Sequence, residues 1–280
     1  MRLVTFWKDA RWRPAALEGE VVVELSAVDG ADGGDDVRAV IVSLMQGRTV
    51  SRGAVYPRGD VRFGAPVPNP GKTICIGLNY REHAKEGGNP IPDYPAVFLR
   101  AGTSLIADGE PLIVPACSPQ LDYEAELAII IGRTARNVPR AEALDYVFGY
   151  SCFNDGSVRD FQRKSGQWTI GKNFDATGAF GPAVVTADEL PPGAEGLSVR
   201  CQLNGTTMQD GNTSDMIFPV PRLIEILSEA MTLEPGDVII TGTPSGVGYA
   251  RKPPVFLREG DVCTIEIDGI GRLSNPVTAA

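Results

Sequence analysis

The sequence predicts an α+β protein in which short β-strands outnumber helices. Most apolar segments are short and either alternating or continuous, which is typical of strands, and few stretches have helical spacing. The chain contains 32 glycines and 22 prolines, distributed and not clustered, which indicates many turns between short strands. With 280 residues the protein is long enough to bury a substantial core.

The first 68 residues are predicted to form a small α+β lobe. Leu3–Trp7 and Val21–Leu25 alternate like strands on either side of a charged turn, which resembles a hairpin. A helical segment follows, with Asp35 or Asp36 as a plausible N-cap. No residue pattern in this lobe indicates a catalytic or binding role.

A second domain is predicted over residues 69–280, because three prolines within 65–71 can neither continue a helix nor lie in a central strand. The Asn204-Gly205 pair between two alternating segments predicts a hairpin. Further strands are expected at 72–77, 95–99, 111–115, 121–131, 146–153, 260–267 and 269–276, with helices near 141–144 and 218–231.

Three acids, Asp122, Glu124 and Glu126, occupy alternate positions just before a continuous apolar run. In a β-strand all three would lie on one face, and at the edge of a low-dielectric core their repulsion would be poorly screened. Oxygen ligands suit a hard cation such as Mg²⁺, Mn²⁺ or Ca²⁺. The alternative is an edge strand with a solvated acidic face, and these residues alone leave both interpretations open.

His83 is the only histidine of the chain, and Glu86 follows three residues later. A short helix would place both on one face, where the carboxylate could orient the imidazole. Gly87 and Gly88 would end this helix and could hinge it as a lid. Taken alone, the pair is more typical of a surface histidine in a helical charge pair.

Several other polar residues have both a functional and an ordinary interpretation. Asp155 is a candidate third ligand or a turn aspartate. Lys172, after a glycine at a predicted strand end, could neutralise an anion or lie at the surface, and Arg159 and Gln162 fit a substrate rim or solvent. The glycine-rich loop 241–248 could cradle an anion with backbone N–H groups, although it lacks the lysine of a P-loop.

Composition argues against several classes of protein. With 26 Lys and Arg against 35 Asp and Glu, the formal charge of −9 disfavours binding to nucleic acid or to a membrane surface and favours small-molecule chemistry. Five scattered cysteines without a CxxC pair indicate a reducing compartment. The first residues show no secretory pattern, and no apolar run approaches the roughly 18 residues of a membrane helix. We therefore expect a cytoplasmic protein.

The chain from about residue 72 to 277 resembles the fumarylacetoacetate hydrolase family. Each motif is weak alone, but their order and spacing also match. One departure is Gly156-Ser157-Val158, where many relatives carry Val-Ser-Ala, which would alter substrate fit and not ligation. The matching segments are Gly77-Leu-Asn-Tyr80 with His83 and Glu86, Asp122-Tyr-Glu-Ala-Glu126, Asn154-Asp155, Arg159-Asp-Phe-Gln162, Gly171-Lys172, Met216-Ile-Phe218, Thr232-Leu-Glu-Pro-Gly-Asp237, Thr241-Gly-Thr-Pro-Ser-Gly-Val-Gly248 and Asn275-Pro-Val277.

The resemblance implies a mixed β-sheet roll as catalytic domain, a small amino-terminal lobe and a homodimer. It also implies one Mg²⁺ or Mn²⁺ held by Glu124, Glu126 and Asp155, with Asp122 supporting these ligands. The other implied site residues are His83 and Glu86 as a lid dyad, Lys172 as enolate partner, and Tyr80, Arg159, Gln162 and Thr243 as substrate contacts.

The function that the resemblance implies is metal-dependent hydrolysis of a C–C bond in a 3-acylpyruvate, such as fumarylpyruvate or maleylpyruvate, in aromatic or diketo-acid catabolism. His83 would deprotonate the attacking water, and Lys172 would stabilise the enolate. Alternatives are oxaloacetate decarboxylation or keto–enol isomerisation of a 2-hydroxydienoate diacid, which need no attacking water. The complete His83–Glu86 pair favours the hydrolase, and a non-catalytic 2-oxo acid binding protein is the remaining class.

Overall fold

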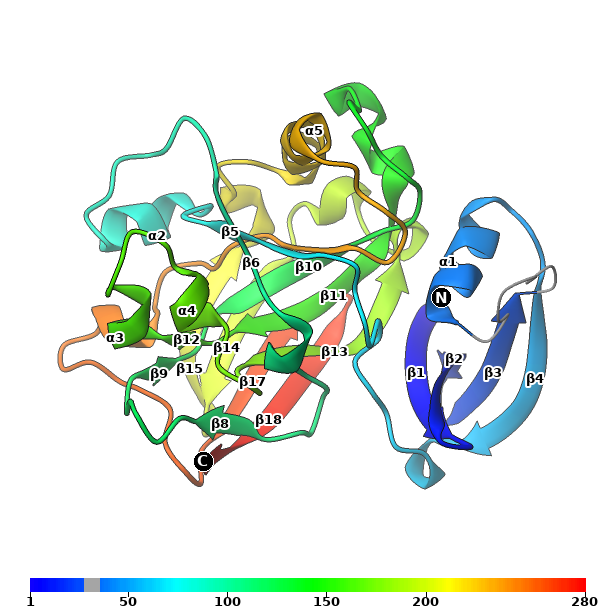
Figure 1. The fold of residues 1–280 in the computed structure, drawn as a ribbon, viewed down its shortest axis with the longest axis horizontal. Coiled ribbons are helices and arrows are strands. Elements are labelled where there is room, and N and C mark those ends of the chain that lie inside the picture. The colour runs from blue at the N-terminus through cyan, green and yellow to red at the C-terminus, as the bar shows by residue number, and fades with distance from the viewer. Residues whose placement is uncertain (28–35) are drawn as a thin grey trace.

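The computed structural model describes residues 1–27 and 36–280, and within them β-strands form the body of the protein (Figure 1). The largest sheet comprises β1 (Arg2–Lys8), β2 (Arg11–Glu18), β3 (Val21–Ala27), β4 (Val50–Pro57), β5 (Thr73–Gly77), β6 (Ala96–Leu99), β7 (Leu105–Ile106), β10 (Ala125–Ile131), β11 (Val147–Asp155), β13 (Gly178–Thr186) and β16 (Val238–Ile240). A second sheet comprises β8 (Leu112–Val114), β14 (Ser198–Leu203), β15 (Thr206–Asn212), β17 (Val262–Ile267) and β18 (Gly271–Ala279), and β9 (Leu121–Asp122) pairs with β12 (Ser157–Val158).

Helices are few and lie outside the sheets. The α-helices are α1 (Val37–Met45), α2 (Arg81–Glu86), α3 (Arg159–Gln162), α4 (Thr169–Lys172) and α5 (Val220–Ala230). The 3₁₀ segments are η1 (Arg58–Asp60), η2 (Gly102–Ser104), η3 (Arg140–Tyr146), η4 (Ala187–Glu189), η5 (Pro192–Ala194), η6 (Thr213–Asp215) and η7 (Gly248–Ala250). This strand-rich arrangement confirms the predicted α+β class. Within residues 1–27 and 36–280, no helix is long and apolar enough to cross a membrane.

The large sheet mixes strand directions and has the spatial order β4-β3-β2-β1-β13-β11-β10-β16-β5-β6, with β7 beside β13. Most neighbours are antiparallel, whereas β16 pairs parallel with β5 and β13 parallel with β7. The smaller sheet has the order β15-β14-β17-β18-β8. Such mixed pairing agrees with the β-sheet roll that the resemblance implied.

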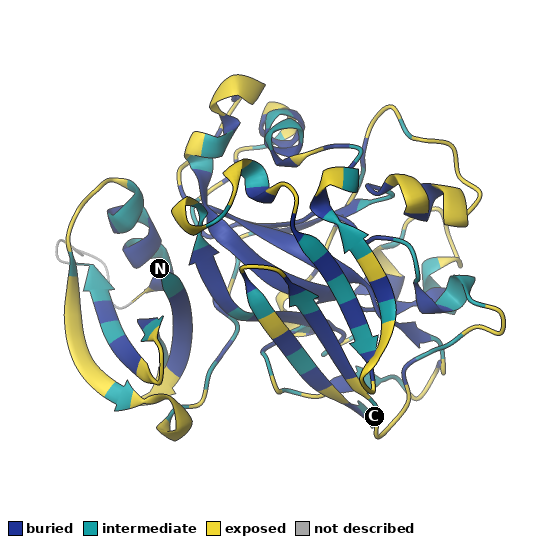
Figure 2. Ribbon diagram, turned by 180° about the vertical axis from the view of Figure 1, so that it is seen from behind, coloured by how far each residue is buried: buried dark blue, intermediate teal, exposed yellow. Residues whose placement is uncertain are grey.

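Both faces of β10 are buried, as its continuous apolar run predicts. Ile129 clusters with Ile265 of β17 between the two sheets, whereas Ile130 clusters with Ile41 of α1 on the opposite face. The alternation follows directly from the two-residue period of a strand. Figure 2 shows these central strands buried and the helices exposed at the periphery.

The amino-terminal strands differ from the predicted hairpin. Arg11–Glu18, which falls where a charged turn was expected, forms β2 and pairs with both β1 and β3. Its arginines and Pro14 hide the strand in the sequence, since Pro and charge are typical of turns. β1 also pairs with β13, so the large sheet continues across the predicted boundary near residue 68, which remains a prediction.

The predicted helix after this meander is α1, and its N-cap is Asp36, whose side chain accepts from Arg38 N at 3.2 Å. The alternative cap, Asp35, lies outside the described residues.

Several local predictions for the second domain need correction. The acidic segment is not one strand, because β9 ends at Asp122 and β10 begins at Ala125, and β10 is central between β11 and β16 and not an edge strand. Asp155 is the last residue of β11 and not part of a turn. Lys172 ends a short helix, α4, and not a strand, and the helix expected near 141–144 is the 3₁₀ segment η3. By contrast, Asn204-Gly205 joins β14 to β15, as predicted.

Asn79 anchors the segment that leads into α2. Its Nδ2 donates to the carbonyl oxygens of Phe218 (3.1 Å) and Thr241 (2.7 Å), and its Oδ1 accepts from Phe218 N (2.7 Å). The side chain is completely buried, so Asn79→Ala would leave these backbone groups without partners or solvent. We expect the free energy of unfolding to fall by about 2 to 4 kcal/mol in chemical denaturation.

The matched control is Asn69→Ala, because Asn69 is exposed. Its unfolding free energy should stay within about 0.5 kcal/mol of the parent protein. Equal denaturation midpoints for the two variants would refute the anchoring role of Asn79.

Candidate active site

Three carboxylates from two neighbouring strands meet at one place. β10 and β11 pair antiparallel, with Ala125 opposite Asn154. Glu124 and Glu126 are the neighbours of Ala125 in the chain, and Asp155 follows Asn154, so this register brings the three acids together. Asp155 N donates to the carbonyl oxygen of Glu124 at 2.9 Å. One carboxylate oxygen from each of Glu124, Glu126 and Asp155 lies within 4.8 Å of the others, and all three side chains are buried. We call these residues the acid triad.

Buried cations surround two members of the acid triad. The Lys172 ammonium contacts one oxygen of Glu124 and one of Asp155. Arg159 Nη2 donates to Glu124 at 2.6 Å, and Arg100 Nη1 donates to Asp155 at 2.7 Å. Although burial opposes ionisation, Arg159 and Lys172 hold the pKa of Glu124 at about 2.

Glu126 differs from the other two carboxylates. Within the described residues it forms no ion pair, and its carboxylate accepts from Gly242 N. Burial, together with the Asp155 and Glu124 carboxylates, raises the pKa of Glu126 well above its ordinary value. The buried cluster, with Asp122 included, thus sets four carboxylates against the three cations Arg100, Arg159 and Lys172. When all four carboxylates are ionised, this oxygen-only set has one excess negative charge and fits a divalent cation such as Mg²⁺ or Mn²⁺, which would stabilise the ionised form of Glu126.

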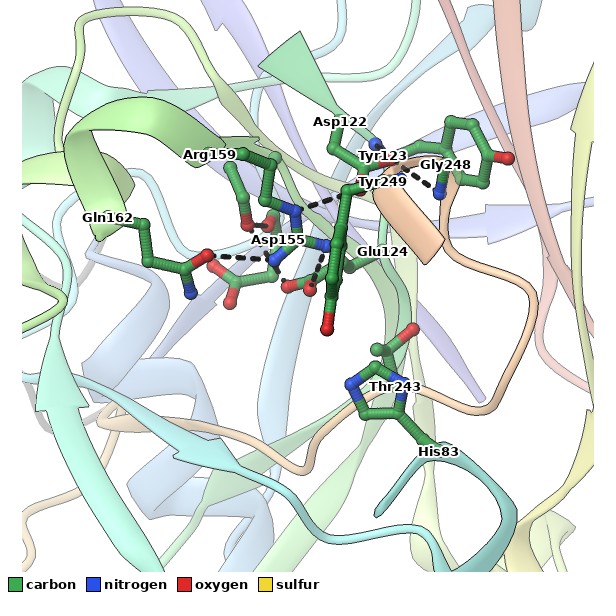
Figure 3. Close-up of polar contacts among 12 residues, drawn as sticks. His83, Asp122, Tyr123, Glu124, Asp155, Arg159, Gln162, Thr243, Gly248 and Tyr249 are labelled. Carbon is green, nitrogen blue, oxygen red and sulfur yellow. Dashed lines mark hydrogen bonds and ion pairs between the residues drawn. The ribbon is translucent and has the colours of Figure 1, made fainter. Parts of the chain in front are cut away.

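Asp122 is not a member of the acid triad. Figure 3 shows it near Glu124, with Arg159 between them. Its carboxylate accepts from Gly248 N (2.8 Å), Tyr249 N (3.0 Å) and Arg159 Nε (2.8 Å). Because Arg159 also holds Glu124, Asp122 orients a member of the acid triad indirectly. This placement suits the supporting position that the resemblance implied.

The amides of the glycine-rich loop bind carboxylates of this chain itself. Gly242 N donates to Glu126, Gly246 N to Glu86 at 3.0 Å, and Gly248 N to Asp122. A Cβ on Gly248 would collide with the carbonyl oxygen of Val255 and with the Asp122 carboxylate. The loop is therefore an anion cradle, as its composition suggested, but these three anions are internal.

A cavity of about 180 Å³ opens onto the acid triad. His83 also lines it and is only 7% exposed, so the interpretation as a surface histidine is wrong. Eight of the site residues predicted from the sequence line the cavity, namely His83, Glu124, Glu126, Asp155, Arg159, Gln162, Lys172 and Thr243.

The remaining two proposed site residues, Tyr80 and Glu86, do not line the cavity. Tyr80 is completely buried in the core at the start of α2, and its substrate contact stays a prediction. Glu86 lies behind His83, with Oε2 3.3 Å from Nδ1. Burial raises its pKa, but the hydrogen bonds from His83 and Gly246 outweigh burial, and the net pKa is lowered.

Several residues of the site were missed. Arg100 ends the β6 region as an apparent surface arginine, but is buried against Asp155, Ser104 and Thr177. The motif ending at Gly248 stopped one residue short of Tyr249. No local pattern distinguishes the other cavity-lining residues that were missed, among them Asn89, Phe98, Arg163 and Trp168.

The mixed sheets, together with a cavity lined by buried carboxylates and the cations that pair with them, are typical of an α+β enzyme. The family profile for the fumarylacetoacetate (FAA) hydrolase C-terminal domain matches residues 72–278, and the chain belongs to the fumarylacetoacetate hydrolase family. This confirms the resemblance that the motifs indicated.

Similar proteins include two oxaloacetate tautomerases. The mitochondrial protein fahd2 of Xenopus laevis is 44% identical over 225 residues, which covers 80% of this chain and 70% of the relative. YisK of Bacillus subtilis is 45% identical over 229 residues, which covers 80% of this chain and 75% of the relative.

Solved structures share the whole fold. 5-Carboxymethyl-2-hydroxymuconate delta-isomerase from Mycobacterium smegmatis has a TM-score of 0.82 at 35% identity, with all of both chains covered. Maleylpyruvate hydrolase from Sphingobium sp. SYK-6, in complex with manganese(II) and pyruvate, has a TM-score of 0.79 at 31% identity, again with complete coverage of both chains. This fold thus occurs in both an isomerase and a hydrolase.

Proposed function

We propose that this protein catalyses cation-dependent keto–enol tautomerisation of a four-carbon 2-oxo diacid of the oxaloacetate type. The observation that carries the proposal is the buried acid triad with its excess negative charge, facing a cavity of only about 180 Å³. Drug-sized ligands occupy roughly 300 to 1,000 Å³, so a small substrate fits better than an extended acylpyruvate. The two relatives named oxaloacetate tautomerases support the same choice over the acylpyruvate hydrolysis that the motifs favoured.

Glu124, Glu126 and Asp155 would hold one Mg²⁺ or Mn²⁺. Such a cation supplies Lewis acidity toward the 2-oxo group of the substrate. The manganese and pyruvate in the Sphingobium hydrolase support a divalent cation and a 2-oxo acid in this fold. Lys172 would place its ammonium charge beside the oxygen on which negative charge develops.

His83 would move the proton. The Glu86 carboxylate lies 3.3 Å from Nδ1 and is itself held by Gly246 N, so Nδ1–H points to Glu86 and Nε2 is the atom available as a base. We assign Nε2 the removal of a proton from the carbon next to the 2-oxo group. Thr243 would act as a wall of the cavity, because its hydroxyl donates to Ala125 O and accepts from Gln209.

Acylpyruvate hydrolysis is the second candidate. It would use the same groups, with His83 taking its proton from water, and the similarity to maleylpyruvate hydrolase favours keeping it. Decarboxylation of oxaloacetate is a further outcome of the same enolate chemistry. The predicted homodimer and cytoplasmic location remain predictions.

The test compares substrates side by side. Purified protein with Mg²⁺ should interconvert keto and enol oxaloacetate, followed by ultraviolet absorbance, with kcat/KM at least about tenfold above that for fumarylpyruvate hydrolysis. This ratio corresponds to about 1.4 kcal/mol of transition-state preference. A chelator should remove the activity, and added Mg²⁺ or Mn²⁺ should restore it.

The reverse ratio would show that hydrolysis is the main reaction. Calorimetric binding of oxalate without turnover of either substrate would instead identify a non-catalytic binding protein. Undiminished activity after complete removal of divalent ions would refute the role of the acid triad.

A further inference from the structure

Three cationic side chains line the cavity within the part of the chain that the structure describes: Arg159, Arg163 and Lys172. Arg159 is paired with Asp122 and Glu124, and Lys172 with Glu124 and Asp155. Among residues 1–27 and 36–280, Arg163 has no carboxylate within ion-pair distance. It is therefore the cavity cation that no carboxylate of the described residues neutralises.

Arg163 is held in place without hydrogen bonds from its guanidinium group to the described residues. Its backbone N donates to Arg159 O at 3.3 Å, directly after α3. Its guanidinium carbon lies 4.6 Å from the centroid of the Tyr249 ring, and Arg159 lies 4.5 Å from the same centroid. Stacking on an aromatic face leaves the in-plane N–H groups of a guanidinium free to bind a carboxylate.

The position of Tyr249 is fixed by a hydrogen bond, because its backbone N donates to Asp122 at 3.0 Å. Figure 3 shows the Tyr249 ring beside Arg159, next to the carboxylates. Arg163 is exposed, unlike the buried Arg159 and Lys172, so it lies at the mouth of the cavity. The cavity therefore has an acidic inner end and a cationic mouth.

The charge balance separates the two carboxylates of a diacid substrate. At the inner end, four carboxylates face three cations, so a bound divalent cation would leave one net positive charge. The carboxylate next to the 2-oxo group would neutralise that charge. Among the cavity-lining residues that the structure describes, Arg163 is then the cation left without an ion pair, and it can bind the second carboxylate of the substrate.

We propose that Arg163 binds the substrate carboxylate remote from the 2-oxo group and thereby selects 2-oxo diacids over 2-oxo monoacids. The inference rests on the proposed function for the chemistry at the inner end. A guanidinium suits this task because its planar fork can donate two parallel hydrogen bonds to one carboxylate. Tyr249 is the positioning residue that holds the fork at the mouth.

The test follows exchange of the hydrogens on carbon 3 with solvent deuterium by NMR, since this readout serves a diacid and a monoacid alike. With Mg²⁺ present, Arg163→Gln should raise the KM for oxaloacetate by roughly 10- to 100-fold, the range expected for a lost charge-assisted hydrogen bond, while kcat changes little. Exchange of 2-oxobutanoate should change by less than about twofold. The KM of Arg163→Lys for oxaloacetate should lie between those of the parent protein and Arg163→Gln, since lysine keeps the charge but not the planar fork of donors.

Lys164→Gln is the matched control. It removes the same charge one residue further along, from an ammonium that lies 3.2 Å from the centroid of the Phe161 ring and does not line the cavity. Its KM for oxaloacetate should stay close to that of the parent protein. An equal rise in KM for Lys164→Gln, or for both substrates with Arg163→Gln, would show general electrostatic attraction or a structural effect and overturn the proposal.

A binding measurement separates this inference from the proposed reaction. Calorimetry compares 3,3-difluoro-oxaloacetate, which cannot enolise, with trifluoropyruvate on the Mg²⁺-loaded protein. If Arg163→Gln loses affinity for the diacid and not for the monoacid, the proposal is supported, whether or not the oxo acids exchange their hydrogens. Absence of hydrogen exchange in the parent protein would refute the tautomerase function and leave this binding result unaffected. Normal exchange and normal diacid binding in Arg163→Gln would refute the proposal and leave the tautomerase intact.

Discussion

Glu126→Gln should abolish the cation-dependent activity and leave the cation-free protein at least as stable as before. Glutamine has the size of glutamate, and its carbonyl oxygen can still accept from Gly242 N. The substitution removes one ionisable carboxylate from a buried cluster in which carboxylates outnumber cations. Cation affinity should fall by more than about 100-fold, since even residues that only orient metal ligands are typically worth about 10- to 100-fold.

The measurement is the melting temperature with and without Mg²⁺. For the parent protein, a cation at 100 times its Kd should add about 2.7 kcal/mol of stability, and Glu126→Gln should lose this gain. The control is Asp122→Asn, which keeps the acid triad but places an NH₂ group against the donors Tyr249 N and Arg159 Nε, so its cation-free melting temperature should fall. If Glu126→Gln behaves like Asp122→Asn, Glu126 is a structural residue and not a ligand.

Two of the three members of the acid triad could be predicted locally. Glu124 and Glu126 flank Ala125, and the two-residue period of extended chain places both on one face whatever the rest of the protein does. Local sequence leaves Asp155 as either a third ligand or a turn aspartate, and only the resemblance favours the ligand, because the register that sets Ala125 against Asn154 depends on two segments far apart in sequence. The same period wrongly extended the strand to Asp122, whose carboxylate is bound by loop amides.

Long-range partners explain what the sequence could not predict. Arg100 resembles a surface arginine at the end of a strand until Asp155 and Thr177, from β11 and the residue before β13, supply its buried partners. The glycine-rich loop shows a subtler limit. Its composition predicts exposed amides that bind an anion, and they do, but glycine spacing cannot specify that Glu86 and Asp122 of the same chain are those anions.

His83→Gln should lower kcat by roughly 10²- to 10⁴-fold, the usual contribution of a general acid or base. Glutamine can still hydrogen-bond to Glu86 but cannot accept a proton at neutral pH. Because His83 is not part of the acid triad, the Mg²⁺-induced rise in melting temperature should persist. Lys85→Gln on the same helix is the control, since Lys85 is exposed and does not line the cavity. Unchanged tautomerisation in His83→Gln would assign proton transfer to another group, whereas loss of the Mg²⁺ effect would mean that His83 shapes the cation site instead of moving protons.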